Sequence, residues 1–237
     1  TNDELLIDKK TTSIGEIKNI EIQYLDITED VFDITVEDNH NFYANNILVH
    51  NCLEIALPTK PLDNINDEKG EIALCTLSAF NLGAIENLDE LEELADLAVR
   101  ALDSLLDYQD YPVIAARKSS LSRRSLGIGV INYAYYLAKN GVRYSDGSAN
   151  NLTHKTFEAV QYYLLKASMN LAKEQGACEY FNETSYAKGL LPIDTYKEDI
   201  NSLTNEPLHY DWETLRKEIK DFGLIQILWF AKNYPNL

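Results

Sequence analysis

Cysteine is scarce in this sequence, and so are long hydrophobic runs. Cys52, Cys75 and Cys178 are the three cysteines among 237 residues, and they are too few and too scattered for a disulfide framework or a structural zinc site. No apolar run approaches the ~20 residues of a membrane span, and the amino end carries no secretory signal. These absences favour a reducing compartment, the cytoplasm, and a protein without a membrane partner.

Positive charge is also in short supply. The sequence holds 21 Lys and Arg against 38 Asp and Glu, which gives a formal net charge of -17. Because such a surface repels phosphate backbones, nucleic acid is not expected as a direct partner. A hydrophobic fraction of 45% nevertheless allows a real core in one or two domains. The chain begins at Thr1 and not at Met, so we expect a fragment or a processed piece.

The segment 1–50 shows the two-residue alternation that is typical of β-strands. Apolar residues alternate with polar ones over 20–24 and 31–36. Two turns and two short strand segments follow, with the turns at 37–39 and 45–46 and the strands at 40–43 and 47–50. A β-meander of this size cannot hold a core by itself, so it requires a partner segment.

The character of the chain changes after Cys52, where extended stretches and a polar loop give way to helical periodicity. In the first helix Asn87 is the expected N-cap, and an apolar stripe at helical spacing runs from Leu88 through Leu97 to Leu105. The expected extended segments are 53–58 and 72–80, the loop is 61–70, and three further helices are expected at 125–140, 151–175 and 212–220.

His50, Asn51 and Cys52 together offer the groups needed to cut one peptide bond and to make another. The side-chain amide of Asn51 can attack its own backbone carbonyl, which closes a succinimide and releases the amine of residue 52. His50 and His40 can assist the proton transfer, because the ordinary pKa of histidine lies near working pH. The thiolate of Cys52 can hold an acyl chain. The alternative is a chance tripeptide at the end of a strand.

With its flanking segments, this junction resembles the carboxyl-terminal splicing motifs of inteins. The resemblance rests on Val-Phe-Asp-Ile-Thr-Val at 31–36, His-Asn-Phe at 40–42 and Ile-Leu-Val-His-Asn-Cys at 47–52. A complete intein opens with a nucleophilic Cys or Ser and carries a Thr-x-x-His block, and neither lies upstream of Asp33. We therefore expect the carboxyl-terminal part alone, either one half of a split intein or a truncated precursor.

The intein resemblance also implies roles for individual residues. Asn51 cyclises and His50 assists it, while His40 and Asp33 serve proton transfer and the activation of Cys52. Cys52 is then the first residue of the downstream host segment, and it accepts the upstream host segment as a thioester.

From Cys52 onward the sequence resembles the catalytic subunit of class I ribonucleoside-diphosphate reductases, of the Ia type found in enterobacteria and phages. The resemblance rests on Cys-Leu-Glu-Ile-Ala-Leu-Pro-Thr-Lys-Pro from 52, Glu-Ile-Ala-Leu-Cys-Thr-Leu-Ser-Ala-Phe-Asn-Leu-Gly from 71, Arg-Ser-Leu-Gly-Ile-Gly-Val-Ile-Asn from 124 and Arg-Tyr-Ser-Asp-Gly-Ser-Ala-Asn-Asn-Leu-Thr-His from 143. It runs to about Gly223, and residues 224–237 depart from the family's pattern.

The reductase resemblance implies that Cys52 forms the thiyl radical that abstracts the ribose 3'-hydrogen, and that Glu54 takes the 3'-hydroxyl proton. Positions 52 and 54 of a strand share a face, so thiol and carboxylate can address one ribose edge. Cys75 matches one of the two cysteines that supply reducing electrons. Taken singly, Cys75 reads as a buried thiol in an apolar strand and Glu54 as a member of an ion pair. Cys178 is expected to be structural.

The two resemblances together predict an α+β or α/β chain in three parts. Residues 1–51 are expected to form a β-rich intein segment of the HINT type, residues 52–223 a helix-rich segment of a ten-stranded α/β reductase barrel, and residues 224–237 a divergent tail. Cys52 then has two tasks in succession, first as the acyl acceptor of splicing and afterwards as the radical residue.

Partners follow from the same resemblances. They are a complementary amino-terminal intein and reductase half, the small radical subunit, thioredoxin or glutaredoxin, and ribonucleoside diphosphates. The chain itself is expected to bind no cofactor and no metal, because the family keeps its radical-generating metal in the partner subunit and binds ATP or dNTP effectors outside this segment. The alternative is a decayed fragment without chemistry, which only docks to other reductase parts.

Overall fold

The computed structural model describes residues 41–44, 47–50, 57–195, 201–225 and 227–228. Contacts within the chain divide it into two units, Thr1–Glu54 and Ile55–Leu237. In the first unit, strands β1 (Asn41–Ala44) and β2 (Ile47–His50) form an antiparallel hairpin in which Asn41 pairs with His50. The two short strands predicted here are therefore confirmed, and the rest of the predicted meander lies outside the described residues.

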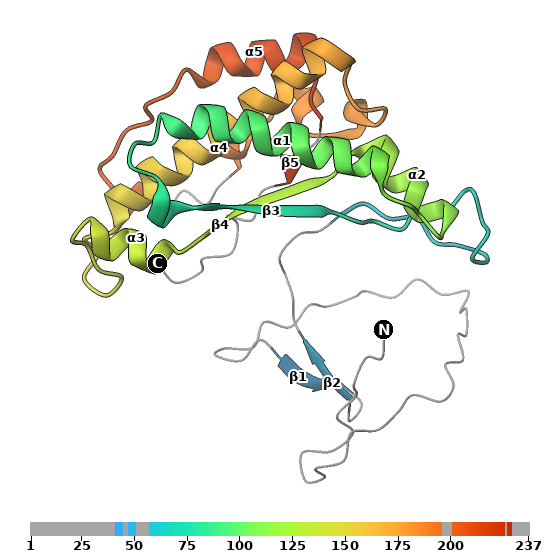
Figure 1. Cartoon of the computed structure of the whole chain (residues 1–237), viewed down its shortest axis with the longest axis horizontal. Helices are drawn as coiled ribbons and strands as arrows, with labels where there is room; N and C mark the ends of the chain where they lie inside the picture. The colour runs from blue at the N-terminus through green and yellow to red at the C-terminus, as the bar shows by residue number, and fades with distance from the viewer. Residues whose placement is uncertain (1–40, 45–46, 51–56, 196–200, 226, 229–237) are drawn as a thin grey trace. The chain divides into compact units, whose positions relative to one another are not determined.

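The second unit is built on a parallel sheet of three described strands, β3 (Thr76–Asn81), β4 (Leu126–Ile131) and β5 (Ile227–Leu228). The strand order is β3-β4-β5, with Thr76 opposite Leu126 and Leu126 opposite Ile227. Parallel neighbours need long crossover connections, and the helices of the unit supply them. Figure 1 shows α1 and α4 together on one side of β3 and β4.

Helices fill both connections between the strands of this sheet. The α-helices are α1 (Glu90–Tyr108), α2 (Ile114–Arg123), α3 (Tyr133–Lys139), α4 (Asn150–Gln175) and α5 (Trp212–Phe222), and the short 3-10 helices are η1 (Leu82–Ala84), η2 (Phe181–Glu183), η3 (Tyr186–Lys188) and η4 (Pro192–Asp194). Among the described residues, no helix combines the length and the apolar character that a membrane crossing requires.

The N-cap of α1 is Asp89 and not the predicted Asn87, and the Asp89 side chain makes no capping hydrogen bond. Asn87 instead stabilises the turn before the helix, where its Oδ1 accepts a hydrogen bond from Asp89 N at 3.1 Å, and Glu90 Oε1 accepts one from Asn87 N at 2.7 Å. The buried face is shifted from the predicted stripe. Its members are Leu91, Ala95, Val99, Leu102, Asp103 and Leu106, whereas the predicted Leu97 and Leu105 are exposed.

The helix predicted over 125–140 is wrong in its first half. Residues 126–131 form strand β4, which is buried over 126–128, Asn132 adopts a left-handed backbone with φ 63°, and α3 begins only at Tyr133. Gly127 and Gly129 disfavour a helix, and the β-branched residues between and after them favour a strand once β3 offers a pairing partner. The prediction also missed α2, whose apolar periodicity is weak.

The predicted helices at 151–175 and 212–220 are confirmed as α4 and α5. Gly176 and Gly223 follow them with φ of 90° and 80°. The two helices are joined by Glu158, a buried carboxylate of α4 that accepts from the backbone N of His209 at 2.8 Å and from Trp212 Nε1 at 3.0 Å. Cys178 is buried in the core between α4 and α5, as expected of a structural cysteine.

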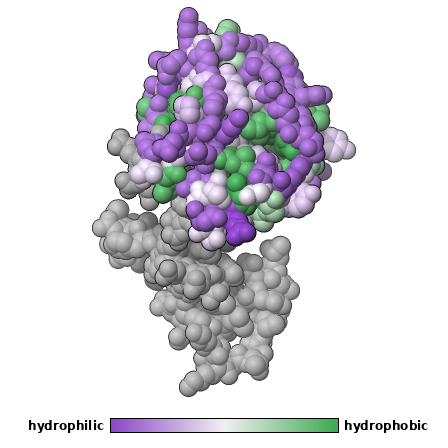
Figure 2. Space-filling model, turned by 90° about the vertical axis from the view of Figure 1, so that its left-hand side faces the viewer, coloured by the Kyte–Doolittle hydropathy of each residue, from purple (hydrophilic) through white to green (hydrophobic). Residues whose placement is uncertain are grey.

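The predicted divergent tail takes part in the sheet. Leu224 and Ile225 are buried, and β5 pairs with β4 directly after them. The side of the molecule seen in Figure 2 is largely hydrophilic, with hydrophobic residues gathered in smaller groups. Ion pairs link helices on the surface, for example Arg100 of α1 with Glu174 of α4, whose Nη2 and Oε1 atoms lie 2.6 Å apart.

Candidate active site

Cys75 is the one predicted site residue whose side chain the structure describes. It is partly buried and stands directly before β3. The next residue, Thr76, donates its backbone N–H to the carbonyl of Ser125 at 3.4 Å, so the thiol-bearing end of β3 is fixed beside the start of β4. The extended stretch predicted around Cys75 is confirmed from Thr76 onward.

The other predicted site residues cannot be placed around Cys75. His50 is the last residue of β2, in the other unit, and only its backbone is described. The remaining five lie outside the described residues, and they are Asp33, His40, Asn51, Cys52 and Glu54. The expected meeting of Cys52, Glu54 and Cys75 therefore stays a prediction.

A buried ion pair holds the segment that leads into Cys75. Arg123 Nε donates to Glu71 Oε2 at 2.7 Å, and Lys60 Nζ lies 2.5 Å from Glu71 Oε1. Glu71 is 1% exposed and Arg123 is 5% exposed. Burial opposes ionisation of Glu71, but the hydrogen bonds from Arg123 and Lys60 outweigh it and hold the pKa of the carboxyl below its ordinary value.

The aromatic ring of Tyr180 covers the same pair. The guanidinium carbon of Arg123 lies 4.7 Å from the centre of that ring, and Lys60 Nζ lies 5.4 Å from it, distances at which a cation is attracted to a ring face. Tyr180 is positioned in turn by α2, since its backbone N–H donates to the carbonyl of Ser122 at 3.2 Å. The ring of Tyr180 therefore attracts both cations that pair with Glu71.

Arg124 fastens the start of β4 to α1. Its backbone is left-handed, with φ 46°, which turns the chain from α2 into the strand. Nε donates to Asp103 Oδ1 at 2.5 Å, and Nη2 donates to Asp107 Oδ2 at 2.8 Å. The Asp107 carboxylate, despite burial, raises the pKa of Arg124 above its usual range. The two adjacent arginines therefore bind different elements. Arg123 binds the segment before β3, and Arg124 binds α1.

Sequence reasoning missed Glu71, Arg123 and Arg124 as positioning residues. The signal that could have found them is the pair of adjacent arginines directly before an apolar segment, because buried arginines require carboxylate partners. Which carboxylates those are is a long-range property of the fold, since Glu71 lies far from Arg123 along the sequence.

The side of β3 and β4 that faces away from the helices has small or exposed side chains. We call this side the open face and define it by Leu77, Ala79 and Asn81 of β3 with Gly127, Gly129 and Ile131 opposite them. Leu77 is 61% exposed and Ile131 is 54% exposed. By contrast Phe80, Leu126 and Ile128 face the helices and are buried in the core.

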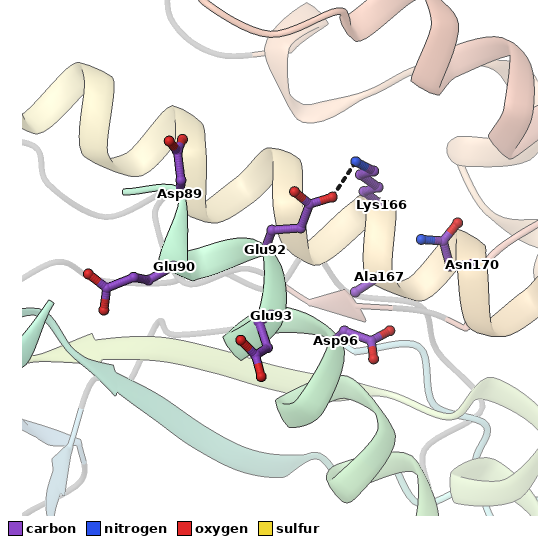
Figure 3. A pocket seen from close by; sticks show the side chains of 8 residues that line it. All are labelled: Asp89, Glu90, Glu92, Glu93, Asp96, Lys166, Ala167 and Asn170. Atoms are coloured by element: carbon purple, nitrogen blue, oxygen red, sulfur yellow. Dashed lines mark hydrogen bonds and ion pairs between the residues drawn. The ribbon is translucent and has the colours of Figure 1, made fainter. Parts of the chain in front are cut away.

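A cavity elsewhere in the unit is a poor candidate for chemistry. It has a volume of about 380 Å³ and lies between the first turns of α1 and the middle of α4. Figure 3 shows Glu92 turned toward Lys166, and these two residues form an ion pair at 2.5 Å. Glu90 Oε1 accepts a hydrogen bond from Asn87 N, and Asp96 binds Arg100. Glu90, Glu92 and Asp96 of the acidic lining are therefore engaged with other groups of the protein. Within the part of the chain that the structure describes, no group of three or more His, Cys, Asp or Glu residues could hold a metal ion.

Comparisons with known proteins connect this unit to one family. The sequence model of "Ribonucleotide reductase, barrel domain" matches residues 31–231. The chain is 87% identical over 173 residues to the ribonucleoside-diphosphate reductase subunit alpha of Haemophilus influenzae, an alignment that covers 73% of this chain and 23% of that protein. It is 79% identical over 173 residues to ribonucleoside-diphosphate reductase 1 subunit alpha of Escherichia coli, with the same coverage.

A phage relative is more distant. The subunit alpha of enterobacteria phage T4 is 46% identical over 175 residues, which cover 73% of this chain and 22% of that protein. The relatives are enzymes, and the chain spans about a quarter of their length. From the match over residues 31–231 and the mixed α/β unit with its parallel strands, the chain belongs to the ribonucleotide reductase barrel-domain family.

Proposed function

We propose that this chain is a precursor of the catalytic subunit of a class I, Ia-type ribonucleoside-diphosphate reductase. Residues 1–51 are the carboxyl-terminal part of an intein, residues 52–223 are a segment of the reductase barrel, and residues 224–237 are a tail. The observation that carries the proposal is a 173-residue alignment at 87% identity, in a chain where Cys52–Leu224 has that same length and follows His50-Asn51 directly. Because the family match begins earlier, at residue 31, we place the boundary between the intein part and the reductase part by the chemistry of the Asn51–Cys52 junction.

Splicing at the Asn51–Cys52 bond needs only groups that the sequence provides. The amide nitrogen of Asn51 attacks the backbone carbonyl carbon of the same residue, a succinimide closes, and the bond to the nitrogen of Cys52 breaks. His50 donates the proton that the leaving amine requires. Cys52 carries the upstream acyl group as a thioester, which passes to its newly released amine and becomes a peptide bond. His40 and Asp33 assist by proton transfer.

The joined product is the reductase. Cys52, once oxidised to a thiyl radical, takes the hydrogen from C3' of a ribonucleoside diphosphate, and Glu54 takes the proton of the 3'-hydroxyl. Cys75 supplies reducing electrons together with a second cysteine of the reductase, and thioredoxin or glutaredoxin restores both thiols. The fixed start of β3, tied to Ser125, supports this role because a redox thiol must be held at a defined place beside the substrate.

The radical source and the effectors belong to other parts of the enzyme. A small subunit with a metal centre generates the radical, and ATP or dNTP effectors bind outside this segment.

The proposal is tested by mixing the full chain with a complementary half that carries the amino-terminal intein part behind the upstream reductase segment. Intact-mass spectrometry is expected to show a ligated product and a released peptide ending at Asn51. Asn51→Ala should abolish the release because alanine cannot cyclise, and Cys52→Ala should abolish the joining. Unchanged release from Asn51→Ala, or a new bond elsewhere, would overturn the splicing mechanism.

The matched control is Asn45→Ala, which changes an asparagine of the same segment that is not next to Cys52. It should splice as the native chain does. The alternative, a decayed fragment that only docks to other reductase parts, predicts no change of mass in any of these mixtures.

A further inference from the structure

The sequence contains one Asn-Gly pair, Asn140-Gly141, and it stands directly at the end of helix α3. An asparagine before a glycine is the one most prone to deamidation, because glycine has no Cβ to hinder the attack of its backbone nitrogen on the asparagine side chain. Both residues are exposed. Since water reaches the pair, the conformation of its backbone decides whether it reacts.

The backbone around this pair forms a Schellman motif. Gly141 is left-handed, with φ 71°. Its N–H donates to the carbonyl of Ala138 at 3.0 Å, and the N–H of Val142 donates to the carbonyl of Leu137 at 3.1 Å. The nitrogen that would attack is therefore held by a hydrogen bond to the helix.

The side chain of Asn140 is held as well. Its Nδ2 donates to the carbonyl of Tyr136 at 2.8 Å, which keeps the amide against the last turn of α3. The backbone of Asn140 has ψ 3°, so the nitrogen of Gly141 eclipses the nitrogen of Asn140 about the Cα–C bond. A five-membered imide instead needs the Gly141 nitrogen to eclipse Cβ. Ring closure therefore requires the C-terminal cap of α3 to open.

We propose that Asn140 is a deamidation site that the C-terminal cap of α3 controls. When the cap opens, the nitrogen of Gly141 bonds to Cγ of Asn140, the Cγ–Nδ2 bond breaks, and ammonia leaves with the proton of the Gly141 amide. Water then opens the imide, at the side-chain carbonyl to give aspartate or at the backbone carbonyl to give isoaspartate. This reaction differs from the one proposed for Asn51, where the side-chain nitrogen attacks the backbone carbonyl and no ammonia leaves.

The product cannot restore the cap. A carboxylate has no N–H to donate, so its oxygens would lie against the carbonyl oxygen of Tyr136 without a hydrogen atom between them. It also places a negative charge at the carboxyl end of a helix, where the helix dipole disfavours it. Deamidation therefore keeps the cap open once it has opened, and the reaction is an irreversible record of that opening.

The packing of α3 against its neighbours opposes the opening. Leu137 is 1% exposed in the core, and the hydroxyl of Tyr136 lies 2.9 Å from Oγ1 of Thr156 on α4. Local opening depends on the contacts that hold a segment in place. The rate of deamidation should therefore follow the stability of α3.

The experiment incubates the full chain at mildly alkaline pH, folded in buffer and unfolded in concentrated urea. Peptide mapping by mass spectrometry follows the deamidation of Asn140, and hydrogen exchange follows the amides of Gly141 and Val142. We expect deamidation of the folded chain to be at least ~10-fold slower than that of the unfolded chain. Equal rates overturn the proposal, because the cap would then not control the reaction.

Leu137→Ala tests the link between opening and reaction. The loss of a buried side chain should speed hydrogen exchange at Gly141 and raise the rate of deamidation in buffer by a similar factor. A variant that unfolds entirely should react at the rate measured in urea. Leu97→Ala, which changes an exposed leucine of α1, should alter neither rate. Faster exchange without faster deamidation in Leu137→Ala overturns the control by the cap.

Asn140→Asp installs one of the two products and tests whether the cap can form again. Hydrogen exchange at Gly141 and Val142 should be at least ~3-fold faster than in the native chain, because a donor is lost and a charge is added at the helix end. The matched control is Asn182→Asp, which adds the same charge at an exposed position of η2 and should leave exchange at these two amides unchanged. Native exchange in Asn140→Asp overturns the irreversible step.

Discussion

Arg123 and Glu71 join two segments that are far apart in the sequence, the end of α2 and the stretch before β3, through a hydrogen bond of 2.7 Å between Nε and Oε2. Both side chains are almost fully buried. A buried ion pair contributes little net stability over apolar residues of the same volume, but the loss of one partner is costly because the other charge stays buried. The pair therefore acts chiefly by holding the approach to Cys75 in one arrangement.

Arg123→Met should destabilise the second unit by about 3 kcal/mol. The methionine keeps the apolar stem of the side chain and removes the guanidinium, so the loss reflects a Glu71 carboxylate left with Lys60 as its cationic partner. Urea unfolding followed by tryptophan fluorescence measures the change. The double variant Glu71→Leu with Arg123→Met should be more stable than Arg123→Met alone, since no charge then stays buried. A double variant that is less stable would contradict this account.

The same carboxylate gives a pH dependence with a definite sign. The pKa of Glu71 in the folded chain lies below its ordinary value of 4.5. A group with a lowered folded pKa contributes stability above its unfolded pKa and loses it as the pH falls through the folded value. The free energy of unfolding should therefore fall as the pH is lowered below about 4.5.

The control for this pH dependence is Glu71→Gln, which cannot titrate. Its unfolding free energy should be lower at neutral pH and should fall less steeply in acid. Asp107 and Asp194, whose pKa values are also lowered by arginine partners, remain in both proteins, so the difference between the two curves reports on Glu71. Parallel curves would show that Glu71 does not contribute.

Glu158→Gln should loosen the segment before α5. The carboxylate accepts from the backbone N–H groups of His209 and Tyr210 and from the indole N–H of Trp212, and a glutamine offers these donors one oxygen and a competing NH2 group. We expect a loss of about 2 kcal/mol and faster hydrogen exchange at the amides of His209 and Tyr210. Lys155→Ala, at an exposed position of the same helix, should change stability by less than about 0.5 kcal/mol. Unchanged hydrogen exchange at these amides in Glu158→Gln would argue against a role of Glu158 in holding the segment before α5.

Cys75→Ser should separate the two proposed activities. Serine keeps the shape of the side chain but cannot form the disulfide that reductant-driven turnover requires. Ligation with the complementary half should proceed at the native rate, while the ligated product, assayed with its small subunit and thioredoxin, should lose at least ~100-fold in turnover. Cys178→Ser, at a buried core position, should not affect turnover in this way. Native turnover of the Cys75→Ser product would remove Cys75 from the mechanism.

The long helices were predictable because local signals and tertiary contacts agree there. The apolar period of α4 and the glycines after α4 and α5 each act within a few residues. Strand β4 was not predictable from the same signals. Its apolar residues also fit a helical period, and only pairing with β3, about fifty residues earlier in the sequence, decides between the two.

The candidate site, too, was predictable only in part. The motif around Cys75 predicted an extended backbone, and the structure places that residue at the head of β3. The partners of Arg123 and Arg124 could not be read from the sequence, because a chain with 38 acidic residues offers many possible partners for each cation. Only the packing of α1, α2 and β3 selects Glu71, Asp103 and Asp107.

The parallel pairing of the strands also fixes a time order during synthesis. Leu126 pairs with Ile227, about a hundred residues later, and closing so long a loop costs entropy before any contact compensates for it. At about 5–20 residues per second, the ribosome completes residue 227 roughly ten seconds or more after Cys52. The sheet of β3, β4 and β5 is therefore incomplete until residue 227 has been made.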